Sequence, residues 1–145
     1  AIAERVDHIL QEQCGYTFSN NPHYIPNQSR QVRMDDLSEK DLAAKIAENP
    51  QWGNIVCRCE MVSEAEIVQA CHRRIPCTNT DMVKRRLRPG MGRCQGGFCQ
   101  AKVMKIISRE REMLYEKVTK TGGKSYIVFD RTKNLGSEIF QGGHL

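Results

Sequence analysis

Four of the seven cysteines in this chain form two close pairs, which constrain the fold more than any other feature. The first pair is Cys57 and Cys59, and the second is Cys94 and Cys99. Residues two positions apart in an extended backbone point to the same face, so the first pair could chelate one metal ion. Glycines before and within the second pair predict a loop whose backbone comes very close to a bound group. We therefore predict a four-cysteine metal site.

The composition favours metal binding over disulfides. Charged residues make up 27% and aromatic residues 6% of the 145 residues, which is typical of a soluble helical domain. The cysteine count is odd and the start lacks a signal-peptide pattern, so we expect a reducing, cytoplasmic setting. No run approaches the roughly 18 apolar residues of a membrane span. Because no Met begins the chain, we expect a piece of a longer protein.

Apolar spacing and capping residues predict a mainly α fold, a small bundle of short helices around the cysteine site. A first amphipathic helix is expected over residues 2–13, and a second from the capping box at Ser38 to about Glu48. An extended segment over 54–59 should carry the first cysteine pair.

Three further helices are expected around the second half of the site. Ser63 and Glu66 form a capping box for a helix that continues through Cys71 and ends before a proline. After a tight turn, Thr78 or Thr80 should cap the next helix, which ends at Pro89-Gly90. A longer helix should begin near Phe98 and extend to Leu114, which places Cys99 at a helix N-terminus.

These elements suggest three segments. Residues 1–50 would precede the metal-binding domain, and within them the stretch 14–34 has no periodicity and suits packing on a partner surface. Residues 51–117 would form the metal-binding helical domain. Residues 118–145 would be a C-terminal hairpin or tail, built on a turn and one strand.

A 2Fe-2S cluster and a zinc ion both fit four cysteines. A 2Fe-2S cluster needs four thiolates, whereas zinc accepts four as a closed structural site and more often uses pairs spaced two to four residues apart. The C-x-C spacing favours the cluster, and a structural zinc or subunit-docking module remains the alternative. A pair of disulfides is a further alternative. Rieske ligation fits poorly because all the histidines lie outside the pairs, at His8, His23, His72 and His144.

Several groups near the pairs could stabilise an anionic cluster. They are the N–H groups around Gly96 and Gly97, the start of the helix near Phe98, and the cations Arg58 and Arg93. Each favours the reduced, more negative state and should raise the reduction potential. The remaining cysteines are expected to be non-ligands, with Cys71 on an apolar helical face and Cys14 and Cys77 in connectors.

A basic run between Arg73 and Arg93 offers a different function. It holds seven Lys or Arg residues opposed only by Asp81, and with two short helices it could suit a DNA-binding helix-turn-helix. We favour the simpler interpretation of a basic face that meets solvent, an anionic cluster or a partner, without nucleic acid.

The central motifs resemble a known family. The segments Ile55 to Glu60 and Pro89 to Cys99 look like the 2Fe-2S domain of the bacterioferritin-associated-ferredoxin type. They are more closely similar to the version at the C-terminal end of FAD-dependent oxidoreductases of the anaerobic glycerol-3-phosphate dehydrogenase kind. The resemblance covers about residues 50–116. Arg93 departs from the family, where a less bulky residue is frequent, and this could alter the potential or occupancy of the cluster.

The resemblance implies a function and a ligand set. It makes Cys57, Cys59, Cys94 and Cys99 the ligands of a 2Fe-2S cluster. It also implies that an upstream FAD domain of the same chain reduces the cluster, which passes electrons to a further subunit or acceptor. The segment from residue 1 to about 48 would be the end of that flavin domain. A stand-alone ferredoxin serving an iron-storage protein would not need this N-terminal extension.

Overall fold

A computed structural model describes residues 1–25 and 30–129. The chain divides into two compact units, Ala1–Arg30 and Gln31–Leu145, which are described separately. The first unit contains one helix, α1 (Ile2–Glu12), as expected from its apolar spacing. No residue within this helix is buried, and Ile2 is 83% exposed. On the apolar face of α1, Ile2 and Val6 are therefore exposed, whereas Ile9 and Leu10 are half-buried.

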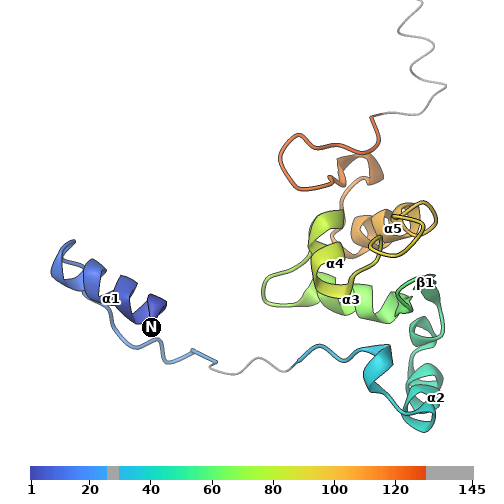
Figure 1. The fold of residues 1–145 in the computed structure, drawn as a ribbon, viewed down its shortest axis with the longest axis horizontal. Helices are drawn as coiled ribbons and strands as arrows, with labels where there is room; N and C mark the ends of the chain where they lie inside the picture. The colour runs from blue at the N-terminus through green and yellow to red at the C-terminus, as the bar shows by residue number, and fades with distance from the viewer. Residues whose placement is uncertain (26–29, 130–145) are drawn as a thin grey trace, which may run out of the picture. The chain divides into compact units, whose positions relative to one another are not determined.

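The second unit begins with short helical elements that lead to the cysteine site (Figure 1). The 3-10 turn η1 (Met34–Asp36) precedes α2 (Glu39–Glu48), where the Ser38 side chain accepts a hydrogen bond from the Asp41 N–H and caps the helix as predicted. A second 3-10 turn, η2 (Pro50–Trp52), follows and buries Trp52.

A small antiparallel sheet carries the first cysteine pair. Strand β1 (Ile55–Cys57) pairs with β2 (Val62–Ser63), so the extended segment is confirmed only as far as Cys57. Residues 58–61 form a turn in which Met61 has a φ of 45°, because the chain must reverse within four residues to pair Val62 with Cys57. The expectation of an extended backbone at Cys59 is therefore wrong.

The capping box predicted at Ser63 opens α3 (Glu64–His72). The Ser63 hydroxyl accepts a hydrogen bond from the Glu66 N–H, and the Glu66 carboxylate accepts one from the Ser63 N–H at 2.7 Å. Glu66 is only 1% exposed and also accepts a hydrogen bond from the Met34 N–H at 3.3 Å. This buried carboxylate therefore joins the lead-in segment to the start of α3.

Helix α4 (Thr80–Leu87) differs from expectation at its start. Its cap is Asn79, whose side chain accepts a hydrogen bond from the Met82 N–H, and neither Thr78 nor Thr80 caps it. Residues 73–79 separate α3 from α4, so the connection is a loop and not a tight turn. Proline ends the helix as predicted, through Arg88 in a left-handed conformation.

Helix α5 (Gln100–Glu110) follows the second cysteine pair, with Cys99 as its N-cap, as expected. It ends before Leu114, which is 69% exposed, so the prediction of a helix through Leu114 is wrong. The chain turns at Glu112, whose φ is 49°, and the Ser108 hydroxyl donates a hydrogen bond to the Met113 carbonyl. The 3-10 turn η3 (Tyr115–Lys117) follows.

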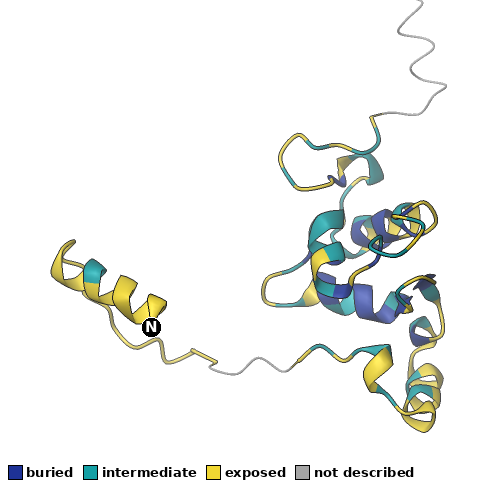
Figure 2. Ribbon diagram, viewed as in Figure 1, coloured by how far each residue is buried: buried dark blue, intermediate teal, exposed yellow. Residues whose placement is uncertain are grey.

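The core lies where α3, α4 and α5 pack together beside β1 (Figures 1 and 2). Its side chains are almost fully buried and are contributed by all these elements. Burying each of its large aliphatic side chains contributes about 1.5–3 kcal/mol, so this small bundle is the stable part of the chain. The expected mainly α fold is confirmed. The largest core residues include Val62, Ile67, Leu87, Met104 and Ile107.

The C-terminal part of the described chain is largely irregular. A single β-bridge joins Thr119 to Tyr126 around a turn, which is the only trace of the expected hairpin in residues 118–129. The rest of that prediction lies at 130–145, outside the described residues. None of the described helices has the length and apolar character needed to cross a bilayer.

Candidate metal centre

One cavity brings together all four cysteines of the two pairs. Its volume is about 400 Å³, and its remaining lining side chains are apolar or cationic. Cys57 reaches it from the end of β1, Cys59 from the following turn, Cys94 from the glycine-rich loop, and Cys99 from the start of α5. The other lining residues are Val56, Arg58, Arg93, Phe98 and Lys102.

Two thiol–thiol contacts join the first pair to the second. The Sγ atoms of Cys59 and Cys94 lie 3.7 Å apart, and the Cys57 thiol is close enough to hydrogen-bond that of Cys99. A metal ion bound tetrahedrally at about 2.3 Å from each sulfur separates its sulfurs by about 3.8 Å. The Cys59–Cys94 spacing therefore suits two ligands of the same metal ion.

The four thiols form two contacts, one between Cys59 and Cys94 and one between Cys57 and Cys99. Among the residues that the structure describes, no three His, Cys, Asp or Glu side chains are placed to share a single metal ion. Two thiol approaches, each joining one cysteine of the first pair to one of the second, suit a 2Fe-2S cluster, because each iron needs two protein thiolates.

Gly92 holds the glycine-rich loop against the first cysteine pair. A Cβ atom at Gly92 would lie 2.2 Å from the Cβ of Cys59, far closer than any real contact. The sequence predicted an approach of this loop to a bound group, whereas the close approach in the structure is to Cys59, and only glycine permits it. The sequence signal was the Gly-Met-Gly run, but its contact could not be read from the sequence.

Gln95 fixes the shape of the same loop. It has a φ of 47°, and its side-chain amide donates hydrogen bonds to the carbonyls of Met91 at 3.1 Å and Gly92 at 2.9 Å. Its own N–H also donates to the Gly92 carbonyl at 2.9 Å. Gln95 was not singled out from the sequence, and its role depends on a backbone conformation that a sequence pattern does not reveal.

The loop backbone favours ionisation of one thiol in particular. The N–H groups of Phe98 and Gly96 donate to the Cys94 sulfur and lower the pKa of its thiol, with help from the Cys59 side chain. Burial, reinforced by Cys57, raises the pKa of Cys99 to about 11. Of these two thiols, Cys94 is therefore the more readily ionised to the thiolate form that a metal ligand requires.

The two arginines expected near the site are present, and a third cation joins them. Arg58, Arg93 and Lys102 all line the cavity, and none of the three is buried. Lys102 was not anticipated, because its position depends on where α5 begins. Lys102 lies three residues after Cys99, and α5 places it one turn from that cysteine.

Cys71 and Cys77 do not line this cavity. Cys71 and Cys77 are fully buried in the core, and Cys14 is exposed in the first unit. Burial raises the pKa of Cys71 to about 12, and burial also raises the pKa of Cys77. Both thiols therefore stay protonated at neutral pH and act as small apolar residues.

The basic run does not form a single free cationic face. Arg88 pairs with Glu60 at 2.7 Å, and Arg85 lies 3.9 Å from Asp81. Arg86 donates a hydrogen bond to the Ile75 carbonyl and so secures the loop between α3 and α4. Part of the charge that suggested DNA binding therefore has structural partners.

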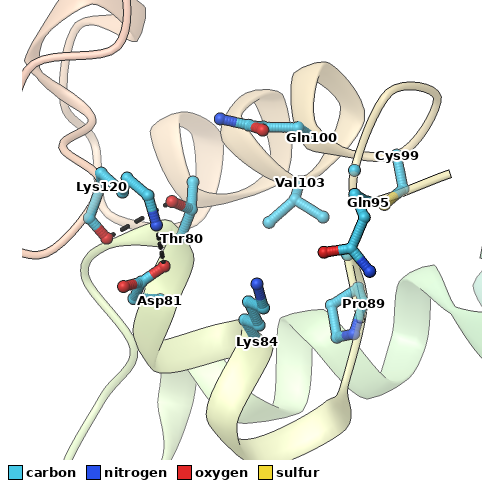
Figure 3. Close-up of a pocket in the computed structure, with 11 residues that line it drawn as sticks. Thr80, Asp81, Lys84, Pro89, Gln95, Cys99, Gln100, Val103 and Lys120 are labelled. Carbon is cyan, nitrogen blue, oxygen red and sulfur yellow. Dashed lines mark hydrogen bonds and ion pairs between the residues drawn. The ribbon is translucent and has the colours of Figure 1, made fainter. Parts of the chain in front are cut away.

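A second, smaller cavity of about 140 Å³ shares Cys99 with the first. Figure 3 shows the Lys84 side chain pointing into it from α4, with Gln100 on α5 and Gln95 on the glycine-rich loop at other sides of the cavity. The ion pair between Lys120 and Asp81, at 2.8 Å, lies at its edge. This ion pair lowers the pKa of Asp81 and ties the C-terminal segment to α4.

Comparison with known proteins agrees with this geometry. The chain is 42% identical over 99 residues to a glycerol 3-phosphate dehydrogenase of Caloramator mitchellensis, a match that covers 68% of this chain and 21% of the relative. It is also 42% identical over 65 residues to an opine oxidase subunit of Rhizobium meliloti, covering 45% of this chain and 12% of the relative. The chain thus spans about a fifth or less of these relatives. No solved structure matches it significantly.

The family comparison covers the part of the chain that holds the cavity. Residues 55–109 match the model of the BFD-like 2Fe-2S binding domain. This range contains both cysteine pairs, the sheet, helices α3 and α4, and all of α5 except its last residue, Glu110. The resemblance expected from the sequence is confirmed over residues 55–109, the part of the chain that is similar to the BFD-like 2Fe-2S binding domain.

Proposed function

We propose that this chain is the electron-transfer domain of an FAD-dependent oxidoreductase, in which Cys57, Cys59, Cys94 and Cys99 hold a 2Fe-2S cluster. The observation that carries the proposal is the single cavity around which all four thiols converge, with Cys59 and Cys94 at 3.7 Å. When bound, the cluster supplies a one-electron relay. The chain itself supplies the ligands, the cavity and the surrounding charge.

The approach of the thiols supports a specific ligand assignment. Cys59 and Cys94 would bind one iron, and Cys57 and Cys99 the other, so that each iron joins the β1 region to the α5 region. Such cross-linking would make cluster binding part of the folding energy of the domain. The N–H groups at Cys94 and the three cations at the cavity would raise the reduction potential, because they favour the more negative state.

The relatives suggest the parent enzyme. The longer match is to a protein named glycerol 3-phosphate dehydrogenase, and the shorter one is to a protein named as part of an opine oxidase. We therefore favour a glycerol-3-phosphate dehydrogenase, with the flavin and substrate site in an upstream domain of the same chain. A further subunit would accept the electrons. The exposed apolar face of α1 suits packing against that upstream domain.

Reconstitution tests the cofactor directly. The 145-residue chain, loaded anaerobically with iron and sulfide, should bind two of each and show visible absorption that dithionite bleaches. A colourless protein with one zinc ion after anaerobic purification would contradict the proposal and favour the structural zinc alternative. Serine substitution of Cys59 or Cys94 should abolish the absorption, whereas serine at Cys71 should leave it intact.

The parent activity needs the full-length protein. Glycerol 3-phosphate should reduce its flavin and then its cluster, which separate optical bands can follow. Reduction by an opine and not by glycerol 3-phosphate would move the parent to the other relative's class. Flavin reduction without cluster reduction would contradict the electron relay.

A further inference from the structure

We propose that Phe98 and the three cations at the cavity form a docking face for an acidic one-electron carrier protein. This inference rests on the proposed function, because it assigns the partner with which the cluster exchanges electrons. The docking face is defined here as Arg58, Arg93, Phe98 and Lys102. All four residues line the cavity that holds the cysteines.

Phe98 is the apolar part of the docking face. It is 84% exposed although it directly precedes Cys99, which is buried. The nearby α5 residues Val103 and Met104 are buried in the core, so the domain does not use the Phe98 ring for its own packing. Exposed aromatic side chains beside a functional centre are frequent anchors of protein interfaces.

The three cations make the docking face positively charged. Arg58, Arg93 and Lys102 all reach solvent, and the cavity lining contains no acidic residue. Within the described residues, no ion pair engages any of these three cations, whereas other arginines of this unit are paired, for example Arg88 with Glu60. Three unpaired cations around one opening attract carboxylates and steer an acidic protein toward the redox centre.

Neutralising the cluster is the competing explanation for these charges. A 2Fe-2S cluster with four thiolates is anionic, and nearby cations would compensate it. That explanation accounts for the cations but gives no reason for an exposed phenyl ring between two ligands. A partner with carboxylates around an apolar hollow accounts for both, in the usual pattern of an apolar centre and a polar rim.

The test uses a reduced plant-type ferredoxin, a low-potential one-electron carrier, as the acidic protein probe. One electron passes from the ferredoxin to the oxidised cluster of the 145-residue chain, and no bond forms or breaks. Stopped-flow absorption gives the second-order rate constant at low and high ionic strength. Iron content and visible absorption of each variant confirm equal loading before the rates are compared.

Lys102→Glu should lower the rate constant at low ionic strength by about tenfold or more, and added salt should slow the wild-type reaction. Phe98→Ala should lower it by at least about threefold. The matched controls are Arg74→Glu, an arginine past the far end of α3, and Phe129→Ala, a ring that is 86% exposed outside this cavity. Both controls should stay within about twofold of the wild type.

Two kinds of result would overturn the docking face alone. The first concerns the rate constant of fully loaded protein: either Lys102→Glu and Arg74→Glu lower it equally, or Phe98→Ala leaves it unchanged. The second is that the wild type sediments with phosphatidylglycerol vesicles and Phe98→Ala does not, while both react with ferredoxin at the same rate. That result would make this face a membrane contact. Failure of the wild-type chain to assemble any 2Fe-2S cluster would instead refute the proposed function, and the docking face with it.

Discussion

Gly92→Ala tests whether the contact between the glycine-rich loop and the first cysteine pair maintains the site. The added Cβ would lie 2.2 Å from the Cys59 Cβ and 3.2 Å from its Sγ. To restore an ordinary contact of 3.4 Å, the loop or Cys59 must move by about 1.2 Å (3.4 minus 2.2). Such a movement would disturb the contact between Cys59 and the glycine-rich loop, in which the Sγ atoms of Cys59 and Cys94 lie 3.7 Å apart.

The expected magnitude follows from overpacking. Inserting a methyl group into a tight contact reduces stability by about 1–3 kcal/mol. For a domain of this size, the melting temperature of the loaded protein should fall by roughly 5–20 °C. Displacing one sulfur by more than an ångström also disturbs metal coordination, which tolerates only about 0.2 Å. We therefore expect less than half of the wild-type iron content in the variant.

Gly53→Ala is the matched control. Its added Cβ would meet Ile46 and the Pro50 carbonyl at 3.5 Å, an ordinary contact, and its φ of −82° suits alanine. This variant should keep its full iron content and melt within a few degrees of the wild type. Iron analysis, visible absorption and circular-dichroism melting measure all three proteins. Full loading and unchanged melting of Gly92→Ala would refute the steric argument.

Three further predictions concern the scaffold of the site. Gln95→Ala removes two loop hydrogen bonds, so chelators should extract iron several times faster, while an unchanged rate would show that the backbone alone holds the loop. Ser63→Ala removes the cap of α3 and a partner of the buried Glu66, so urea unfolding should show a loss of about 1–3 kcal/mol, and a loss under about 0.5 kcal/mol would contradict the role of the capping box. In loaded protein, a thiol reagent should modify Cys14 quickly. The pKa of about 12 keeps Cys71 protonated and unreactive from about pH 7 to 9, and rapid modification of Cys71 would contradict its burial.

Local signals in the sequence predicted most of the helices. Ser38 and Ser63 both cap helices, because each hydroxyl is followed three residues later by the N–H that it accepts. The proline after Arg88 ends α4 for an equally local reason. These features depend on neighbours within one turn, and such neighbours are visible in the sequence.

The errors lie where tertiary contacts or unusual backbone angles decide. Asn79 caps α4 although two threonines flank it, because a choice among three suitable side chains depends on how the loop packs. The chain leaves the helical path at Glu112 with a positive φ, which no apolar periodicity forecasts. Similarly, strand pairing forces the turn after Cys57 and moves Cys59 off the strand.

In the candidate site, too, the local features could be predicted from the sequence and the tertiary contacts could not. The four cysteines could be singled out because their spacing is local within each pair. Their approach across the pairs could not, because Cys59 and Cys94 are brought together by the packing of the glycine-rich loop on the turn after β1. The exposure of Phe98 was also hidden, since the sequence placed it only at the start of an apolar helix.

The buried Glu66 has a mechanical consequence for any longer chain that contains this domain. Its carboxylate accepts the Met34 N–H, while the Gln31 side chain donates to its carbonyl at 2.6 Å. Tension applied to the polypeptide before Gln31 would therefore reach the first turn of α3 before it reached α2. Because Ser63 hydrogen-bonds that carboxylate and ends the strand that pairs with β1, a pull from upstream would be transmitted within a few bonds to Cys57, which lines the cavity.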